Sequence, residues 1–197
     1  MALMPYGAYA LLLLVFAWLV FRRLVRQQYL LQGSLRMWAT LLQLLVFCGW
    51  AYFSALQLPR AWPDSTMPWL IRAVGWTVFL VGVCCTLVAG LKLGVGQSFG
   101  LGKATLNVSG LYGLVRNPQV SAMGLALIGH TIVWPTWRLS GALLLYFPIA
   151  HLMVMTEEEH LSRAHGAAYR DYQKRVPRYV PLRHGDTVRT ERGAGAA

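Results

Sequence analysis

The chain has 197 residues, of which 56% are hydrophobic and only 13% are charged. Soluble domains carry roughly a quarter charged residues, and a chain of this length cannot bury so much apolar surface within itself. The composition therefore excludes an ordinary soluble domain and indicates a protein covered largely by lipid. The net charge of +11 comes from basic residues clustered at the ends of apolar runs, so we expect no nucleic-acid partner.

Five apolar segments follow one another along the chain, each close to the roughly 20 residues that a helix needs to cross a bilayer. They lie at residues 6–21, 37–58, 69–91, 119–134 and 139–155. The expected fold class is therefore all-α, a polytopic membrane helical bundle with about five transmembrane helices. Only four residues join the fourth and fifth segments, which fits a tight helical hairpin that stops short of the far side.

The basic residues orient these segments. With the N-terminus outside, all of the 18 Lys and Arg residues except Arg60, Arg72 and Arg138 fall on the cytoplasmic side, as the positive-inside rule requires. The first segment is followed by arginines and lacks the small-residue cleavage site of a signal peptide, so we expect it to be retained as a membrane helix. The absence of a eukaryotic sorting signal favours a prokaryotic inner membrane.

We expect one membrane-embedded domain at residues 1–182 and a disordered polar tail at 183–197. After the fifth segment come Glu157, Glu158 and Glu159, and then a cytoplasmic amphipathic helix that extends to about Val176, with apolar residues at spacings of three and four. Carboxylates are costly near hydrocarbon. At least one of Glu157 and Glu158 should therefore turn toward the bundle and find a partner, whereas Glu159 should be solvated.

A second polar cluster ends the glycine-rich segment 92–118, just before the fourth apolar segment. Pro118 suits the first turn of a helix, because the N–H that it lacks would be unpaired there. The remaining free N–H groups of that turn, together with Arg116 and Asn117, predict a polar and cationic pocket edge at the membrane surface.

Two patterns together resemble the family of isoprenylcysteine carboxyl methyltransferases and phospholipid methyltransferases. The first is Gly-Leu-Tyr-x4-Asn-Pro at 110–118, and the second is Glu-Glu-x2-Leu-x4-Gly-x2-Tyr-x2-Tyr-x2-Arg-Val-Pro at 157–177. The resemblance covers about residues 94–181. It implies a membrane enzyme that binds S-adenosylmethionine with this half of the chain, in a cytoplasmic pocket, and takes a lipophilic substrate from the bilayer.

The resemblance also implies which residues meet the cofactor. They are Gln97, Ala104, Thr105, Leu106, Asn107, Tyr112, Asn117, Pro118, Gln119, Val120 and Glu157. The chain departs from the family in three places, because Ala104, Asn117 and Val120 replace two histidines and a tyrosine. Asparagine can still donate a hydrogen bond but does not titrate. Glu157 matches the family's cofactor-binding acid and can accept from ribose hydroxyls or from the cofactor's amine.

Candidates for orienting or deprotonating the methyl acceptor are Arg116, Glu158, Tyr172 and Arg175. Isoprenylcysteine enzymes carry an arginine one helical turn before the glutamate, where this chain has Met153. An amine, thiol or phenol on a hydrophobic molecule therefore fits better than a prenylated cysteine acid, within the wider class of amine, thiol, hydroxyl or carboxylate acceptors. Methyl transfer from a sulfonium depends mainly on alignment and needs no metal, and the three cysteines lack metal-ligand spacing.

Three alternatives remain. A sterol reductase would share the C-terminal half of the pattern but use NADPH. Two imidazoles, His130 and His151, could ligate a haem, although helix rise places them roughly 15 Å or more apart in depth. A non-enzymatic scaffold or a transporter is the third alternative, and the gathering of polar residues at one membrane face, away from the midplane, argues against it.

Overall fold

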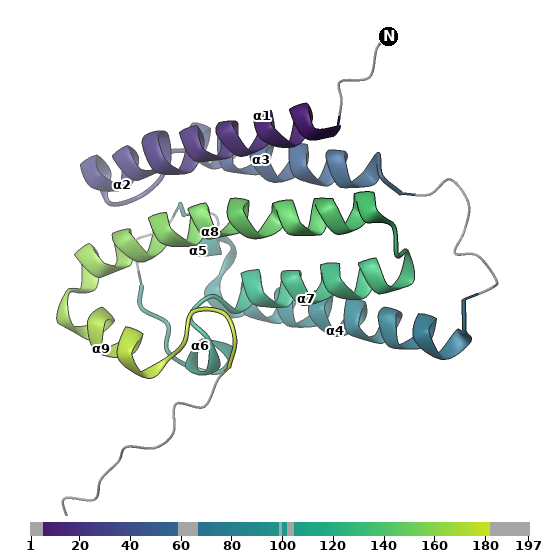
Figure 1. Cartoon of the computed structure of the whole chain (residues 1–197). Coiled ribbons are helices and arrows are strands. Elements are labelled where there is room, and N and C mark those ends of the chain that lie inside the picture. The colour runs from purple at the N-terminus through teal and green to yellow at the C-terminus, as the bar shows by residue number, and fades with distance from the viewer. Residues whose placement is uncertain (1–5, 59–66, 99, 102–104, 182–197) are drawn as a thin grey trace, which may run out of the picture.

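The computed structural model describes residues 6–58, 67–98, 100–101 and 105–181, and all regular secondary structure within those ranges is helical (Figure 1). In chain order the elements are α1 (Tyr6–Trp18), the π-helical segment η1 (Leu19–Val25), α2 (Arg26–Gln32), α3 (Met37–Ala55), α4 (Trp69–Leu93), α5 (Val95–Ser98), α6 (Leu111–Leu114), α7 (Pro118–Val133), α8 (Trp137–His165) and α9 (Ala167–Arg175). The all-α expectation is confirmed. The tail predicted to be disordered, 183–197, lies outside the described residues.

Four helices are long and apolar enough to cross a membrane, judged by length and composition. They are Tyr6–Gln32, Met37–Ala55, Trp69–Leu93 and Trp137–His165. The fifth expected segment, α7, has 16 residues and is thus about 24 Å long, against about 30 Å of hydrocarbon. This agrees with the expectation of a short helical hairpin between α7 and α8.

The N-terminal helix is longer than expected. The prediction that it ends at Phe21 is wrong, because the helix continues through η1 and α2 to Gln32. Arginine, leucine and glutamine are all good helix formers, and the helix ends only where Gly33 adopts a left-handed φ of 67°. At about 1.5 Å per residue the helix is about 40 Å long, which exceeds the about 30 Å of hydrocarbon.

The predicted boundary after residue 155 is also wrong. Helix α8 runs without a break for 29 residues to His165 and carries Pro148 inside it. Gly166, with a φ of 53°, ends α8, and α9 then folds back toward α6 (Figure 1). The single amphipathic helix expected up to Val176 is therefore the end of α8 and a separate α9.

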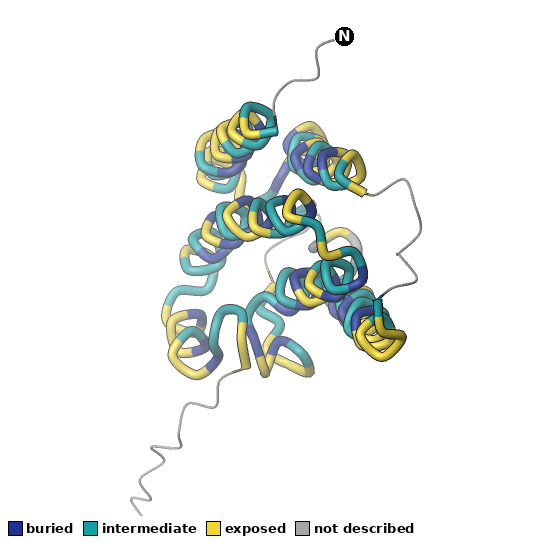
Figure 2. Tube along the Cα trace, turned by 45° about the vertical axis from the view of Figure 1, so that its right-hand side comes forward, coloured by how far each residue is buried: buried dark blue, intermediate teal, exposed yellow. Residues whose placement is uncertain are grey.

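Two sets of contacts hold the bundle together. Helices α1, η1, α3 and α8 enclose the main core, where Val20, Val46 and Ile149 are fully buried. Helices α4 and α7 touch through glycines, because a Cβ on Gly82 would strike the backbone of Ala126. Such close contact between small residues is typical of membrane helices. Exposed residues lie along the outer faces of the helices (Figure 2), and many of them are large and apolar.

Helices α2, α5, α6 and α9 and the first turn of α7 all lie at one end of the bundle, on the left in Figure 1. We refer to it as the α9 end. The glycine-rich segment before Pro118 and the glutamates after Met155 therefore lie at the same end, although some 40 residues separate them in the chain.

Candidate active site

An open pocket lies at the α9 end, with about 980 Å³ of empty space that includes solvent at its mouth. Ten of the eleven residues expected at the cofactor line it, and the eleventh, Ala104, lies outside the described residues. The ten are Gln97, Thr105, Leu106, Asn107, Tyr112, Asn117, Pro118, Gln119, Val120 and Glu157. The structure thus brings together residues that are 60 positions apart in the sequence.

The four residues expected to act on the acceptor divide into two pairs. Arg116 and Tyr172 line the pocket, whereas Glu158 and Arg175 are not among its lining residues. Arg175 is exposed on α9, where its Nε donates to the carbonyl of Asp171 at 3.3 Å. Arg175 therefore does not contact the pocket.

One wall of the pocket comes from α5 and the segment before α6. The side-chain amide of Gln97 donates to the hydroxyl of Thr105. Asn107 Oδ1 accepts from both the N–H and the hydroxyl of Ser109, each at 3.1 Å, which forms a local turn of the kind that asparagine favours. These contacts shape the backbone beside the pocket.

The segment that follows α9 is hydrogen-bonded to the residues at the start of α7, which form the next wall of the pocket. The backbone N–H groups of Arg116 and Asn117 donate to the carbonyls of Pro177 and Arg178, at 2.8 and 3.2 Å. The Tyr172 hydroxyl donates to the Tyr112 carbonyl at 2.5 Å. The residues around the start of α7 therefore owe their position to a segment that follows α9.

Glu158 of α8 contacts both the start of α7 and the segment that follows α9. The residue is 5% exposed, and its carboxylate accepts from Arg178 Nη2 at 2.8 Å and from Asn117 Nδ2 at 3.1 Å. Arg116 Nε lies 3.6 Å away. The sequence correctly predicted a glutamate that turns inward and needs a partner. With its oxygens engaged by three side chains, Glu158 holds α7 and the C-terminal segment against α8.

Glu157, by contrast, lines the pocket, and no hydrogen bond or ion pair to another described residue engages it. Adjacent residues on a helix point about 100° apart, so Glu158 faces its partners while Glu157 faces the open space. A carboxyl oxygen accepts hydrogen bonds whether or not the group is ionised. Glu157 therefore offers the pocket an acceptor for a ligand's hydroxyl or amine groups.

Two aromatic rings that the sequence analysis missed complete the pocket. Tyr29 of α2 and His160 of α8 stack with ring centroids 4.1 Å apart and planes 11° apart, and both line the pocket. His160 lies three residues after Glu157, so helical spacing alone could have found it. Tyr29 could not be found while the first helix was expected to end at Phe21.

The phenol groups of α9 stay protonated near neutral pH. Burial raises the pKa of Tyr172 to about 12 and also raises the pKa of Tyr169. Burial likewise raises the pKa of Tyr112 in α6. The Tyr172 hydroxyl already donates to the Tyr112 carbonyl, and none of these neutral phenols acts as a base in the pocket.

A comparison with protein-family models places residues 70–168 in the phospholipid methyltransferase family. The matched region covers half of the chain and extends from α4 to the start of α9. The chain belongs to this family. Comparisons with curated proteins and with solved structures gave no significant match. The resemblance seen in the sequence is confirmed, and the protein is an integral membrane methyltransferase.

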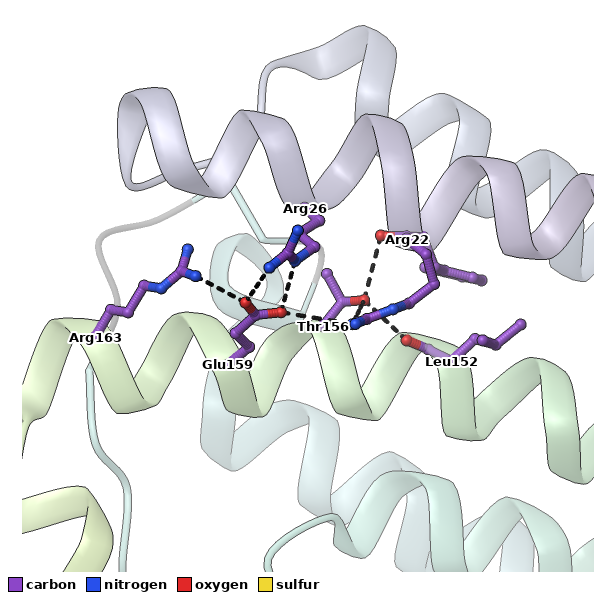
Figure 3. A network of polar contacts seen from close by, with 7 residues as sticks. Arg22, Arg26, Leu152, Thr156, Glu159 and Arg163 are labelled. Atoms are coloured by element: carbon purple, nitrogen blue, oxygen red, sulfur yellow. Dashed lines mark hydrogen bonds and ion pairs between the residues drawn. The ribbon is translucent and has the colours of Figure 1, made fainter.

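Part of the pocket of this methyltransferase comes from outside the matched region. Figure 3 shows Glu159 of α8 between Arg26 of the N-terminal helix, at 2.7 and 2.8 Å, and Arg163, at 2.7 Å. Arg22 adds a contact of 3.5 Å. The expectation that Glu159 is simply solvated is wrong, because the longer first helix brings these arginines to it. This network holds α2, and with it Tyr29, against α8.

Proposed function

We propose that this methyltransferase uses S-adenosylmethionine to methylate a lipophilic small molecule or lipid, with the N-terminus outside and the pocket facing the cytoplasm. The observation that carries the proposal is a half-buried glutamate, Glu157, which has no partner among the described residues and faces a pocket whose other walls carry amides, hydroxyls and stacked rings. The basic residues at the α9 end support the orientation.

The donor set fits the cofactor. Glu157 would accept from ribose hydroxyls or from the amine of the methionyl part, and Asn117 lines the pocket at the first turn of α7, where free N–H groups favour a carboxylate. The Tyr29–His160 stack offers a flat apolar surface to a purine ring. When bound, the cofactor supplies a methyl group on a positively charged sulfur.

The chain's own residues have the task of aligning the acceptor and excluding water, which is worth up to about 7–11 kcal/mol in favourable intramolecular cases. Met153 lines the pocket one helical turn before Glu157. An apolar side chain there provides no cation for a substrate carboxylate. Arg116, the one arginine among the lining residues of the described chain, lies 3.6 Å from Glu158. These features favour an amine, thiol or hydroxyl acceptor.

Calorimetry of the purified protein with S-adenosylmethionine tests this proposal, with NADPH as the competing ligand of a reductase. We expect saturable binding of S-adenosylmethionine only. Glu157→Gln should weaken it by roughly 10-fold or more, since a hydrogen bond to a charged group is worth about 1.5–3 kcal/mol. Asp171→Asn is the matched control, because Asp171 is an exposed carboxylate of α9 that pairs with Lys174. Binding of NADPH alone would refute the proposal.

A further inference from the structure

A second cavity, with about 1,130 Å³ of empty space, lies between α7 and α8. Along most of its length it is apolar and is lined by Gly124, Leu125, Ile128, Phe147 and Pro148. Leu125, Ile128 and Phe147 keep 39–46% of their surface exposed. Because both helices are apolar and belong to the membrane-embedded bundle, the groove opens toward lipid.

The end of this groove that lies nearest to the start of α7 is polar. His151 Nδ1 is 2.8 Å from the Tyr179 hydroxyl oxygen, and both residues line the groove with Ser121. The Ser121 hydroxyl is buried and has no hydrogen-bond partner among the described residues. A buried hydroxyl without a partner costs roughly 1–3 kcal/mol, which points to a ligand that would engage it. Titratable residues inside membrane segments are themselves markers of functional sites.

The groove and the pocket adjoin. Val120, in the first turn of α7, lines both of them. Tyr179 directly follows Arg178, which holds Glu158, and Arg116 of the pocket is close enough for its charge to act on the Tyr179 hydroxyl. A molecule lying in the groove with its head at Ser121 would therefore end next to the pocket.

We propose that this groove binds the methyl acceptor, with its apolar chain along Gly124, Ile128 and Phe147 and its uncharged polar group at Ser121, His151 and Tyr179. From Ser121 to Ile128 the α7 wall measures about 10 Å, which is enough for a chain of eight or so carbons at roughly 1.3 Å each. The assignment of this ligand as the acceptor rests on the proposed function.

The lining determines the class of the ligand. It contains neither Asp, Glu, Lys nor Arg among the described residues, and a charge taken from water into such a site without a partner is strongly disfavoured. Arg178, the nearest cation in sequence, is committed to Glu158. Burial raises the pKa of Tyr179 to about 12, so its hydroxyl stays neutral. A lipophilic alcohol, phenol, thiol or uncharged amine fits, and a phosphate head does not.

Binding of chain-matched probes to the full-length protein in nanodiscs tests the proposal. The probes are 4-dodecylphenol, 1-dodecanol and dodecyl phosphate, and each competes with a radiolabelled 4-dodecylphenol. Gly124→Leu fills the groove, because a Cβ at Gly124 already lies 3.6 Å from Phe147 Cε1. Gly7→Leu is the matched control, since it makes the same change in α1, where nothing lies within 4 Å. Binding of S-adenosylmethionine is measured on each variant.

We expect saturable binding of the two neutral probes and at least 10-fold weaker competition by dodecyl phosphate. Gly124→Leu should weaken 4-dodecylphenol binding at least 10-fold, and Ser121→Ala should weaken it at least threefold. Gly7→Leu should bind 4-dodecylphenol within twofold of the wild-type affinity, and every variant should bind S-adenosylmethionine within twofold of the wild-type affinity. Three results would overturn the groove assignment. They are equal competition by dodecyl phosphate, wild-type affinity for 4-dodecylphenol in Gly124→Leu, and uptake of the probes that does not saturate, as expected for simple partition into the lipid bilayer. If the wild-type protein does not bind S-adenosylmethionine at all, the proposed function is overturned instead.

Discussion

The hydrogen bonds of Glu158 provide the sharpest test of how the pocket is held together. Its carboxylate accepts three close contacts from Arg178 and one from Asn117. Breaking a fully buried ion pair costs about 3–5 kcal/mol. The Arg178 side chain is 37% exposed, however, so solvent screening reduces that value. We expect Glu158→Gln to lower the free energy of unfolding by about 1.5–3 kcal/mol, the worth of hydrogen bonds to a charged group.

The assay is equilibrium unfolding with sodium dodecyl sulfate in mixed micelles, applied to a double-mutant cycle. Glu158→Gln, Arg178→Gln and the double variant should give a coupling energy of about 1 kcal/mol or more, because the two side chains touch. S-adenosylmethionine binding, measured in parallel, should weaken in both single variants, since the start of α7 loses its anchor. If the two substitutions add to within about 0.5 kcal/mol, the pair does not hold the C-terminal segment and the reasoning fails.

Three further predictions concern the helix contact, the pocket wall and the pH response. Gly82→Leu should destabilise the protein by about 1–3 kcal/mol or more in the same titration, because its side chain meets the backbone of Ala126, whereas Gly7→Leu changes little. Tyr29→Ala should weaken S-adenosylmethionine binding by roughly 2–10-fold in calorimetry, by loss of one stacking ring; unchanged binding would remove α2 from the site. The Tyr172 hydroxyl, with its pKa raised to about 12, supports folding while protonated, so its contribution is complete below about pH 10 and is lost toward pH 12. Alkaline unfolding of Tyr172→Phe should therefore be less steep there, while the pH profile of methyl transfer between about pH 6 and 9 keeps its shape.

The local patterns that predicted the site are short and depend on neighbouring residues. Pro118 opens α7 as its missing N–H predicts. Glu157 and Glu158 point in different directions because they are adjacent on one helix. Such features follow from backbone geometry over a few residues, and they were enough to select ten residues that line one pocket.

Helix ends were predicted less well. Charged residues mark where a helix leaves hydrocarbon, but they do not end it, and Arg22 and Glu157 both lie well inside continuous helices. The true ends are Gly33 and Gly166, which adopt left-handed φ angles. Both extensions carry residues that line the pocket, Tyr29 and His160.

The sequence by itself determined the membrane environment, the helical class, the family and most of one pocket wall. These properties depend on the length of the apolar segments and on the spacing of residues that are close together in the chain, and both can be read from the sequence. Only the tertiary structure decided which glutamate has partners and which faces the pocket, which arginine is paired, and that the first helix contributes Tyr29 to the pocket wall. Those outcomes depend on which side chains from distant segments meet at the α9 end, and the residue types alone do not specify that meeting.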